Sequence, residues 1–588
     1  MNIGEFLLRR LAEVGTTHAF GVPGDYNMSF LEQLEAHPTM RWMGNCNELN
    51  AAYAADGYAR SGKPGVLITT YGVGCLSALN GVAGAYCEHI PLIHISGAPP
   101  AHAIRDRKPL HHSLLDGGYR NVHRAFAEFT EYSATISTDN AVEVIDHALR
   151  AAFRSRRPVR LELPSDLTHV DIATPEDALT IGDAEPAHRE VLAAAGQLSE
   201  MLSRAHRPVL VFDAAAVRWG ALPAIERFCA QRDIPYFCTL PAVHYADPTA
   251  EQYQGMLPGA AGQAIVDDSD LVITCGFIRS DVTTACFTLD FAGRSVVRLE
   301  PTYTQFSDST VYYGTTIDAV LDSVGSAAGP RWWPTTARGR AVEPGGGELT
   351  EEFFFGQLQR FLRGGDVLVA ETGTSAQNTV GMSLPEGVSY INQSSWGSIG
   401  YALPALFGSL VARPDRRHVL CTGDGSFQVT VQELSSVIRH GFAPVIFLLN
   451  NRGYTIERSI LGATSAYNDV ADWAYPDVPR AFGIDDDRLL TAVCTTRSEL
   501  QDALAAAADT DRLVFIEVAL QPLDMTAATA AVGEATRVFD YGVNGPPNRY
   551  LPRGQARDAA RTSSRSSTCA MTASGALTSG NEAVEPIV

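Results

Sequence analysis

The chain has 588 residues, 45% of them hydrophobic and 19% charged, which is the composition of a globular protein with more than one domain. Its formal net charge is −21, with 45 basic residues against 66 acidic ones. Because nucleic acids are bound by clustered lysine and arginine, this balance argues against a nucleic-acid surface and favours a small-molecule partner.

The N-terminal stretch MNIGEFLLRRLAEVG has the spacing of an amphipathic helix, without the apolar core and cleavage site of a secretion signal. No uncharged apolar run of the sequence is long enough to span a bilayer, so we expect no membrane partner. The ten cysteines are scattered without a Cys-x-x-Cys spacing, and several lie in apolar runs such as LVITCGF. Reduced thiols show this pattern, and we expect a cytoplasmic location.

Short apolar strands alternate with helical periodicity along most of the chain. The alternation begins with THAFGVPGD, MRWMGNCNE and PGVLITTYGVG, returns at PVLVFDAAA and DLVITCGF, and appears again at HVLCTGDGS and PVIFLLNN. Repeated strand–helix–strand units of this kind build mostly parallel sheets. Residues 172–190 and 329–352 are dense in Pro, Gly and charge, as linkers are. The sequence therefore predicts an α/β protein with three parallel-sheet domains.

We place these domains at residues 1–180, 190–330 and 350–540. The remainder, residues 541–588, is rich in Ser, Thr, Ala and Gly and has few large apolar side chains. Such a segment does not gain enough from burial to offset the entropy lost on ordering, so we expect a flexible C-terminal tail. The middle domain has no Gly-x-Gly-x-x-Gly motif, and we expect it to act as a spacer.

One strand–helix–strand segment of the third domain predicts a metal site. A strand ends at GDGS, residues 423–426, one helix follows, and a second strand ends at NN, residues 450–451. Parallel strands joined by a crossover bring their carboxyl ends to the same sheet edge, so Asp424 and Asn451 are expected to meet there. Their side-chain oxygens and the backbone carbonyl of Gly453 are hard donors that suit Mg²⁺ together with diphosphate oxygens.

Taken alone, GDGS is a tight-turn sequence and NN carries little information. Their combination across one crossover resembles the thiamin diphosphate (ThDP) binding motif. Over residues 1–540 the chain resembles the ThDP-dependent 2-keto acid decarboxylases, closest to the pyruvate, indolepyruvate and branched-chain branch. The stretches FGVPGDYN, NELNAAYAADGYAR, LHHSLLDG and NNRGYTIE carry this resemblance. It implies a pyrimidine-binding first domain, a diphosphate-binding third domain, and bound ThDP and Mg²⁺.

The resemblance assigns the activating carboxylate to Glu48, at the start of the helix NELNAAYAADGYAR. ThDP is deprotonated by its own aminopyrimidine, which needs a carboxyl group hydrogen-bonded to ring nitrogen N1′. In the family this glutamate serves the cofactor held by the partner subunit, which implies a homodimer with shared active sites, assembled as a dimer of dimers. The small alanines of this helix are expected to permit close packing against another chain. Taken alone, a glutamate in a first helical turn only complements the helix dipole.

The stretch SSWGSIGYALPA resembles the element that bends the cofactor. The carbonyl of Gly397 is expected to accept from the 4′-amino group, and the side chain of Ile399 is expected to wedge between the two rings. Taken alone, the stretch is a Gly-rich loop before a helix. Further cofactor contacts are expected from the backbone and side chains of Thr70, Thr374, Gly423, Gly425, Ser426, Asn451, Gly453 and Tyr454.

By the same resemblance, Glu457 lies over the reacting carbon and assists both CO₂ loss and proton delivery. Asp25 and His112 manage protonation and product release, with His111 as their supporting partner. Taken singly, Glu457 is a surface residue and Asp25 belongs to a turn. Because adjacent residues on an extended stretch point to opposite sides, we expect one histidine to face the substrate and the other to position it.

The expected reaction is the non-oxidative decarboxylation of a 2-keto acid to an aldehyde and CO₂. Ala376 and Gln377 stand where relatives with small substrates carry bulky aromatics, which implies a roomy substrate pocket. Ile456 and Ile460 stand against a large pocket, because bulky branched residues at these positions narrow the site in pyruvate-directed relatives. Between these two indications, we expect an aromatic or branched-chain substrate, with pyruvate as the second candidate. Three alternatives stay open: a pyruvate decarboxylase, a carboligase of the acetolactate synthase type, and a catalytically silent ThDP-fold binding protein.

Overall fold

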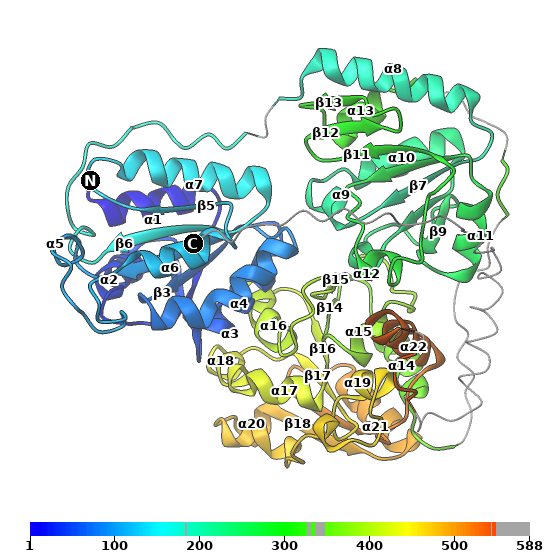
Figure 1. Ribbon diagram of the computed structural model, residues 1–588. Helices are drawn as coiled ribbons and strands as arrows, with labels where there is room; N and C mark the ends of the chain where they lie inside the picture. Colours follow the sequence, from blue (N-terminus) through cyan, green and yellow to red (C-terminus); the bar gives the residue numbers. More distant parts are fainter. Residues whose placement is uncertain (183–184, 326–330, 335–346, 543, 549–588) are drawn as a thin grey trace, which may run out of the picture.

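The computed structural model describes residues 1–182, 185–325, 331–334, 347–542 and 544–548. They form three α/β units, each with one sheet between helices (Figure 1), so the predicted fold class is confirmed. Most of the predicted tail, residues 543 and 549–588, lies outside the described residues, as do parts of both predicted linkers. The predicted domain boundaries stay predictions.

The first unit has a six-stranded sheet in which every neighbouring pair is parallel. Its central strands β3, β4 and β6 are buried throughout, because helices cover both faces of the sheet. In the order β2-β1-β3-β4-β6-β5, the strands are β2 Arg41–Gly44, β1 His18–Gly21, β3 Gly65–Thr69, β4 Leu92–Ala98, β6 Val159–Pro164 and β5 Tyr132–Thr135.

The helices of the first unit divide between the two faces of its sheet. Helices α1, α2 and α7 pack their apolar side chains on one face, and α3, α4 and α6 on the other. The predicted N-terminal helix is α1, which Asn2 and Glu5 close with reciprocal side-chain-to-backbone hydrogen bonds. The helices are α1 Ile3–Glu13, α2 Met28–Ala36, α3 Glu48–Ala59, α4 Val73–Cys87, α5 Ala101–Arg105, α6 Arg120–Ala127 and α7 Ala141–Ser155.

The middle unit has a seven-stranded sheet in the order β13-β12-β11-β10-β7-β8-β9, with β12 antiparallel to both of its neighbours. Its strands are β7 Pro208–Phe212, β8 Tyr236–Cys238, β9 Tyr253–Met256, β10 Leu271–Cys275, β11 Ser295–Leu299, β12 Tyr303–Phe306 and β13 Val311–Tyr313. Its helices are α8 His188–Arg204, α9 Ala214–Arg218, α10 Leu222–Arg232, η1 Leu240–Ala242, α11 Ala260–Asp268, α12 Asp281–Thr284 and α13 Ile317–Ser323.

The third unit again has a fully parallel six-stranded sheet, in the order β15-β14-β16-β17-β19-β18. Its strands are β14 Val367–Ala370, β15 Ser389–Ile391, β16 His418–Gly423, β17 Val445–Asn450, β18 Leu489–Cys494 and β19 Leu513–Ala519. Its helices are α14 Glu351–Phe361, α15 Thr374–Thr379, α16 Ala402–Ala412, α17 Asp424–Thr430, η2 Val431–Glu433, α18 Leu434–Arg439, α19 Thr455–Ile460, η3 Ala466–Asn468, η4 Tyr475–Asp477, α20 Val478–Ala481, η5 Asp486–Arg488, α21 Arg497–Ala507 and α22 Ala527–Tyr541.

The crossover between β16 and β17 corrects the prediction of one continuous helix. The 3₁₀ turn η2 separates α17 from α18. At this break the hydroxyl of Thr430 donates to the carbonyl of Gly400, and Glu433 accepts from the side chain of Asn45 in the first unit. The last helix of the crossover ends just before Gly441, which adopts φ 73°.

Helices α3 and α16 join the first and third units at a very short distance. An ideal Cβ at Gly57 would lie 2.2 Å from the carbonyl oxygen of Ala405, and one at Gly408 would lie 1.8 Å from that of Ala54. Helix α3 is therefore buried inside its own chain on almost every side. The expectation that its alanines pack against another chain is wrong, because α4, β3 and α16 of the same chain already cover them.

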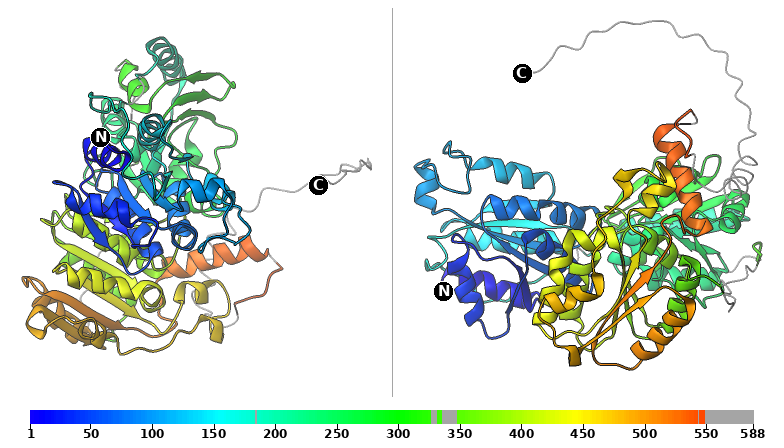
Figure 2. Two further views of the ribbon diagram at one scale, coloured as in Figure 1. Left: turned by 90° about the vertical axis from the view of Figure 1, so that its left-hand side faces the viewer. Right: turned by 90° about the horizontal axis from the view of Figure 1, so that it is seen from below.

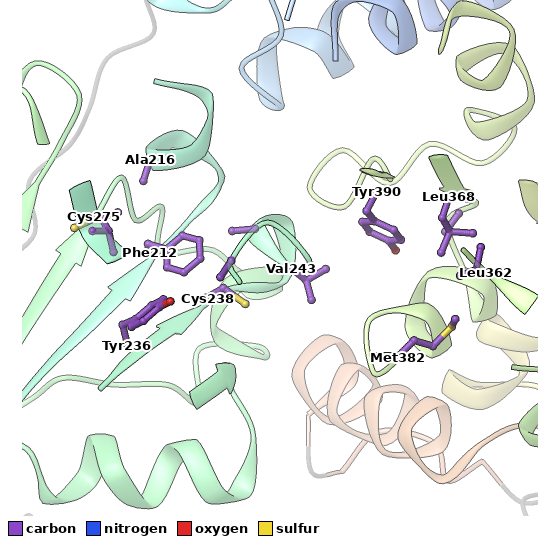
Figure 3. Close-up of a cluster of buried hydrophobic side chains, with 14 of the residues drawn as sticks. Phe212, Ala216, Tyr236, Cys238, Val243, Cys275, Leu362, Leu368, Met382 and Tyr390 are labelled. Carbon is purple, nitrogen blue, oxygen red and sulfur yellow. The ribbon is translucent and has the colours of Figure 1, made fainter. Parts of the chain in front are cut away.

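A second shared core joins the middle and third units. Figure 3 shows its two sides, with Phe212 and Tyr236 in the middle unit and Leu368 and Tyr390 in the third. His244 crosses between them, with its Nε2 atom 2.9 Å from the carbonyl oxygen of Thr379.

Helix α22 lies at the outer side of the third unit, packed on α19 (Figure 2). None of the helices in the described part of the chain is long and apolar enough to cross a membrane.

Candidate cofactor and active site

A cavity of about 300 Å³ opens at the carboxyl edge of the third sheet, where β14, β16 and β17 end. Open parallel sheets bind their ligands at this edge. Most of the predicted cofactor and metal residues of the third unit converge there. The lining residues are Thr372, Gly373, Thr374, Ser375, Ile399, Gly423, Asp424, Gly425, Ser426, Asn451, Gly453, Tyr454, Thr455, Ile456 and Glu457.

Asp424 and Asn451 line this cavity from neighbouring strand ends. Asp424 is fully buried, and burial raises the pKa of its carboxyl group to about 6 although the N–H groups of Gly425 and Gly453 donate to it. Asn451 is buried with no hydrogen-bond partner for its Oδ1 atom among the described residues. A buried carboxylate and an orphaned amide oxygen form a donor set that a hard divalent cation would satisfy, so Mg²⁺ fits this site.

The glycines beside Asp424 and Asn451 are required by close contacts. A Cβ at Gly425 would lie 2.4 Å from the ring of Tyr454. Gly453 has φ 145°, and its Cβ would lie 2.0 Å from the carbonyl oxygen of Asn468. Gly425 and Ser426 form the first turn of α17, where backbone N–H groups have no carbonyl acceptor within the helix. The N–H of Gly425 bonds the Asp424 carboxylate, and a diphosphate fits the donors of such a turn.

Ile399 lines the cavity and is 37% exposed, so it presents an apolar surface there. Gly397, two residues earlier, adopts φ 65° and does not itself line the cavity. The side chain of Gln393 accepts from the N–H of Ser398, and the Tyr53 hydroxyl lies 2.6 Å from the Ser398 hydroxyl. The first unit thus supports this loop through Tyr53.

Glu457 lies in the first turn of α19, at the rim of the cavity. The surrounding protein displaces part of its solvent, and the carboxylate of Asp540 on α22 adds repulsion, so the pKa of Glu457 is raised. A carboxyl group that keeps its proton at a higher pH than an ordinary glutamic acid is suited to acid–base chemistry.

Asp25, His111 and His112 form a second cluster, in the first unit. Their ligand atoms all lie within 4.8 Å of one another. The expectation of an extended stretch with oppositely directed histidines is wrong, because the two residues belong to a turn in which His112 adopts φ 62°. Both rings therefore face Asp25, and Tyr26 stacks on His111 with ring centroids 4.9 Å apart.

Glu48 begins α3 as predicted, directly after the capping residue Asn47. Its Oε1 atom lies 3.0 Å from the place where a Cβ of Gly74 would stand. Thr70 nearby is buried, and its hydroxyl has no hydrogen-bond partner among the described residues. Within a single chain, as far as the structure describes it, neither these two residues nor the histidine cluster lines the cavity of the third unit.

Of the four residues predicted for the substrate pocket, Ile456 lines the cavity. Ala376 and Gln377 lie on α15, whose first residues Thr374 and Ser375 line it, and Ile460 ends α19. In the single chain the structure does not bring these three into the cavity.

Several residues of this region were missed by the sequence analysis. Thr372, Gly373 and Ser375 line the cavity after β14, and Glu371 behind them is fully enclosed, which raises the pKa of its carboxyl group to about 7. Glu371 accepts from the N–H groups of Thr372 and Ala402. The topological rule that identified GDGS applies equally to ETGTS, because both follow neighbouring parallel strands.

Comparison with known proteins agrees with this geometry. Residues 1–118 match the family model for the N-terminal TPP binding domain of thiamine pyrophosphate enzymes, residues 196–321 match the central domain, and residues 372–518 match the C-terminal TPP binding domain. The alpha-keto-acid decarboxylase of Mycobacterium leprae is 35% identical over 552 residues, which cover 91% of this chain and 96% of the relative.

Two further relatives with the same name give similar values. The protein of Mycolicibacterium paratuberculosis is 36% identical over 544 residues, covering 89% of this chain and 94% of the relative. That of Mycobacterium tuberculosis is 35% identical over 548 residues, covering 89% and 95%. With the domain matches and a cavity suited to a metal and a diphosphate, the chain belongs to the family of ThDP-dependent 2-keto acid decarboxylases.

Proposed function

We propose that this chain binds ThDP and Mg²⁺ in the third-unit cavity and decarboxylates an aromatic or branched-chain 2-keto acid to an aldehyde and CO₂. The observation that carries the proposal is the pair of buried oxygen donors, the enclosed carboxylate of Asp424 and the unpartnered Oδ1 atom of Asn451. Asp424, Asn451 and the Gly453 carbonyl would hold the metal, and Gly425 with Ser426 would hold the diphosphate.

Bound ThDP supplies an electron sink for the carbon that loses CO₂. The protein would contribute orientation and proton transfer. Ile399 offers an apolar support inside the cavity, and Glu48 would hold the aminopyrimidine through N1′. Glu457, with its raised pKa, would hold a proton at the rim of the cavity. Proton delivery and product release would be shared with the Asp25–His111–His112 cluster, in which the Asp25 carboxylate is hydrogen-bonded to the imidazole of His111.

The proposed site needs a second copy of the chain. Asp25 and His111 leave 43% and 58% of their side chains exposed in one chain, away from the cavity that would hold the cofactor. The side chains of Val73, Leu76 and Leu114 are more than half exposed. Several large apolar side chains exposed in one unit are typical of a face that another subunit covers. We propose a homodimer with shared sites, paired into a dimer of dimers.

A reducing, cytoplasmic location is part of the same proposal. The nine cysteines in the described part of the chain are all free, and six of them are buried. Free thiols in this number are typical of proteins kept in a reducing compartment.

The test is an aldehyde assay of the purified protein with ThDP and Mg²⁺. The substrates would be phenylpyruvate, indolepyruvate, 2-ketoisovalerate and pyruvate. The proposal expects the highest kcat/KM for one of the first three. Ile456 in the cavity favours pyruvate as the second candidate, and pyruvate leading by a wide margin would reject the roomy pocket. Acyloin without free aldehyde would indicate a carboligase, and no CO₂ from any of the four would refute the proposal.

A further inference from the structure

Arg458 follows Glu457 on α19 and is almost completely buried, with 2% of its surface exposed. Its guanidinium group ends among backbone carbonyl groups. Nη1 donates to the carbonyl of Asn451 at 3.0 Å and to that of Pro522 at 3.2 Å, and Nη2 donates to the carbonyl of Arg452 at 2.7 Å. Among the described residues, its one carboxylate partner is Asp469, whose Oδ1 atom lies 2.9 Å from Nη2.

Two of these carbonyl groups belong to the turn that carries the proposed metal ligands. This turn, residues 451–453, leaves β17 with φ 59° at Arg452 and 145° at Gly453. Two successive residues in the left-handed region give a backbone that does not hold its shape without outside contacts. The N–H of Gly453 bonds the carboxylate of Asp424, so any movement of the turn also moves the Asp424 contact.

Arginine is suited to this task because its planar fork holds several donors in a fixed arrangement. A lysine at the same position would offer one compact ammonium group, which could replace the bonds of Nη1 to Asn451 and Pro522 but not also those of Nη2 to Arg452 and Asp469. The polar groups around the guanidinium group also make its burial possible. A buried guanidinium is stable only when its N–H groups are bonded, and the carbonyl groups of three residues provide those bonds.

We propose that Arg458 is a positioning residue that sets the 451–453 turn before the metal binds. By fixing the carbonyl groups of Asn451 and Arg452, it presets the Asn451 side chain and the Gly453 carbonyl for the cation. It also ties this turn to the helix that carries Glu457. The inference rests on the proposed function, since it concerns the same metal site. Residues that orient metal ligands change metal affinity by about 10–100-fold when they are replaced.

The experiment is a calorimetric Mg²⁺ titration of metal-free protein with excess ThDP, for wild type, Arg458→Lys and Arg417→Lys. Arg417 is the matched control, because it bonds a carboxylate, Asp366, and a backbone carbonyl, Phe361, at the opposite edge of the same sheet. We expect Arg458→Lys to raise the Mg²⁺ Kd by about tenfold while KM for the 2-keto acid at saturating Mg²⁺ stays within twofold. Arg417→Lys is expected to keep the wild-type Kd.

An unchanged Kd in Arg458→Lys, or an equal rise in Arg417→Lys, would overturn the inference. If Arg458→Lys does not fold by circular dichroism, Asp469→Asn replaces it, because the Asp469 side chain is 61% exposed. That variant removes the charge of one partner of the guanidinium, and we expect it to raise the Mg²⁺ Kd by less than Arg458→Lys does, so an unchanged Kd there also refutes the role. Absence of Mg²⁺-dependent ThDP binding in wild type would instead refute the proposed function.

Discussion

The Nε2 atom of His111 lies 2.7 Å from Oδ2 of Asp25, although the two residues stand 86 positions apart in the chain. The turn that directs His111 to this carboxylate directs His112 to it as well, with Nε2 of His112 3.9 Å from Oδ1. One carboxylate thus lies within 4 Å of both imidazoles, so the three side chains form a single cluster.

We expect His112→Phe to lower kcat by about 10²-fold or more, because proton transfer by a positioned group contributes on this scale. ThDP binding, measured by fluorescence titration, is expected to stay at the wild-type Kd. His102→Phe is the matched control, because His102 pairs with a different carboxylate, Asp166, in the same unit. Loss of ThDP binding in His112→Phe would show a structural role instead.

Removing the proposed metal carboxylate is expected to abolish cofactor binding. Asp424→Asn replaces a buried charged oxygen donor with a neutral amide, so Mg²⁺-dependent ThDP affinity should fall by at least about 100-fold, beyond the loss seen for residues that only orient ligands. Asp509→Asn, at an exposed ion pair with Arg363, is the control. The ThDP affinity is measured by calorimetric titration in the presence of Mg²⁺. A wild-type ThDP Kd in Asp424→Asn would exclude this residue as a metal ligand.

Glu457→Gln is expected to lower kcat by about 10²–10⁴-fold with little change in ThDP affinity, because the amide cannot donate a proton. The pKa of Glu457 is raised, so any step that needs its proton persists to higher pH than for an ordinary carboxyl group. Glu386→Gln, at an exposed glutamate of the same unit, is the control.

Asp540 offers a finer test of the same carboxyl group. Its negative charge contributes to the raised pKa of Glu457, so Asp540→Asn should lower that pKa and move the alkaline limb of the kcat profile to lower pH. Since Asp540 is exposed, the displacement should shrink at high ionic strength. If the alkaline limb of the kcat profile does not move at low ionic strength, Glu457 is not the group that sets this limb.

Substrate choice can be examined at Gln377. Gln377→Phe adds an aromatic ring where the pocket is proposed to be roomy, and should shift the ratio of kcat/KM for phenylpyruvate and pyruvate toward pyruvate by about tenfold or more. Gln377→Leu keeps the volume and removes the amide, so it separates size from polarity. If neither variant changes the ratio, Gln377 lies outside the substrate pocket.

Acid stability should depend on His418, which is buried between the hydroxyl of Ser409 and the carbonyl of Arg416. Burial lowers the pKa of His418 from 6.5 to about 4, so below pH 6.5 the unfolded chain takes up a proton that the folded protein refuses. The free energy of unfolding therefore falls between about pH 6.5 and 4, by up to about 1.4 kcal/mol per pH unit for this group.

His418→Gln should reduce the loss of thermal stability between pH 7 and pH 5, measured as the change in Tm within each variant. His206→Gln, at an exposed histidine, should leave that loss as in wild type. Equal losses in all three proteins would mean that another group governs acid unfolding.

Rules that follow from local pattern predicted much of the third unit. The convergence of Asp424 and Asn451 follows from the handedness and direction of a parallel crossover, which leave no other place for the two strand ends. The cluster at His111 did not follow, because a positive φ at His112 is set by its surroundings and not by residue type.

Other features depend on contacts between distant segments. Arg458 has the appearance of an ordinary charged residue in a short helix, and its burial becomes visible only when Pro522 and Asp469 are brought beside it. The glycines of α3 and α16 are likewise unremarkable in sequence, since each is required by the backbone of the other helix.

The contact between α3 and α16 also sets a condition on biosynthesis. Tyr53 on α3 and Ser398, just before α16, stand 345 positions apart. At roughly 5–20 residues per second, the nascent chain carries an uncovered, alanine-lined α3 for tens of seconds before its partner helix is made. A message cut short before α16 would yield a first unit with that apolar face open to water, a ready substrate for chaperones and proteases.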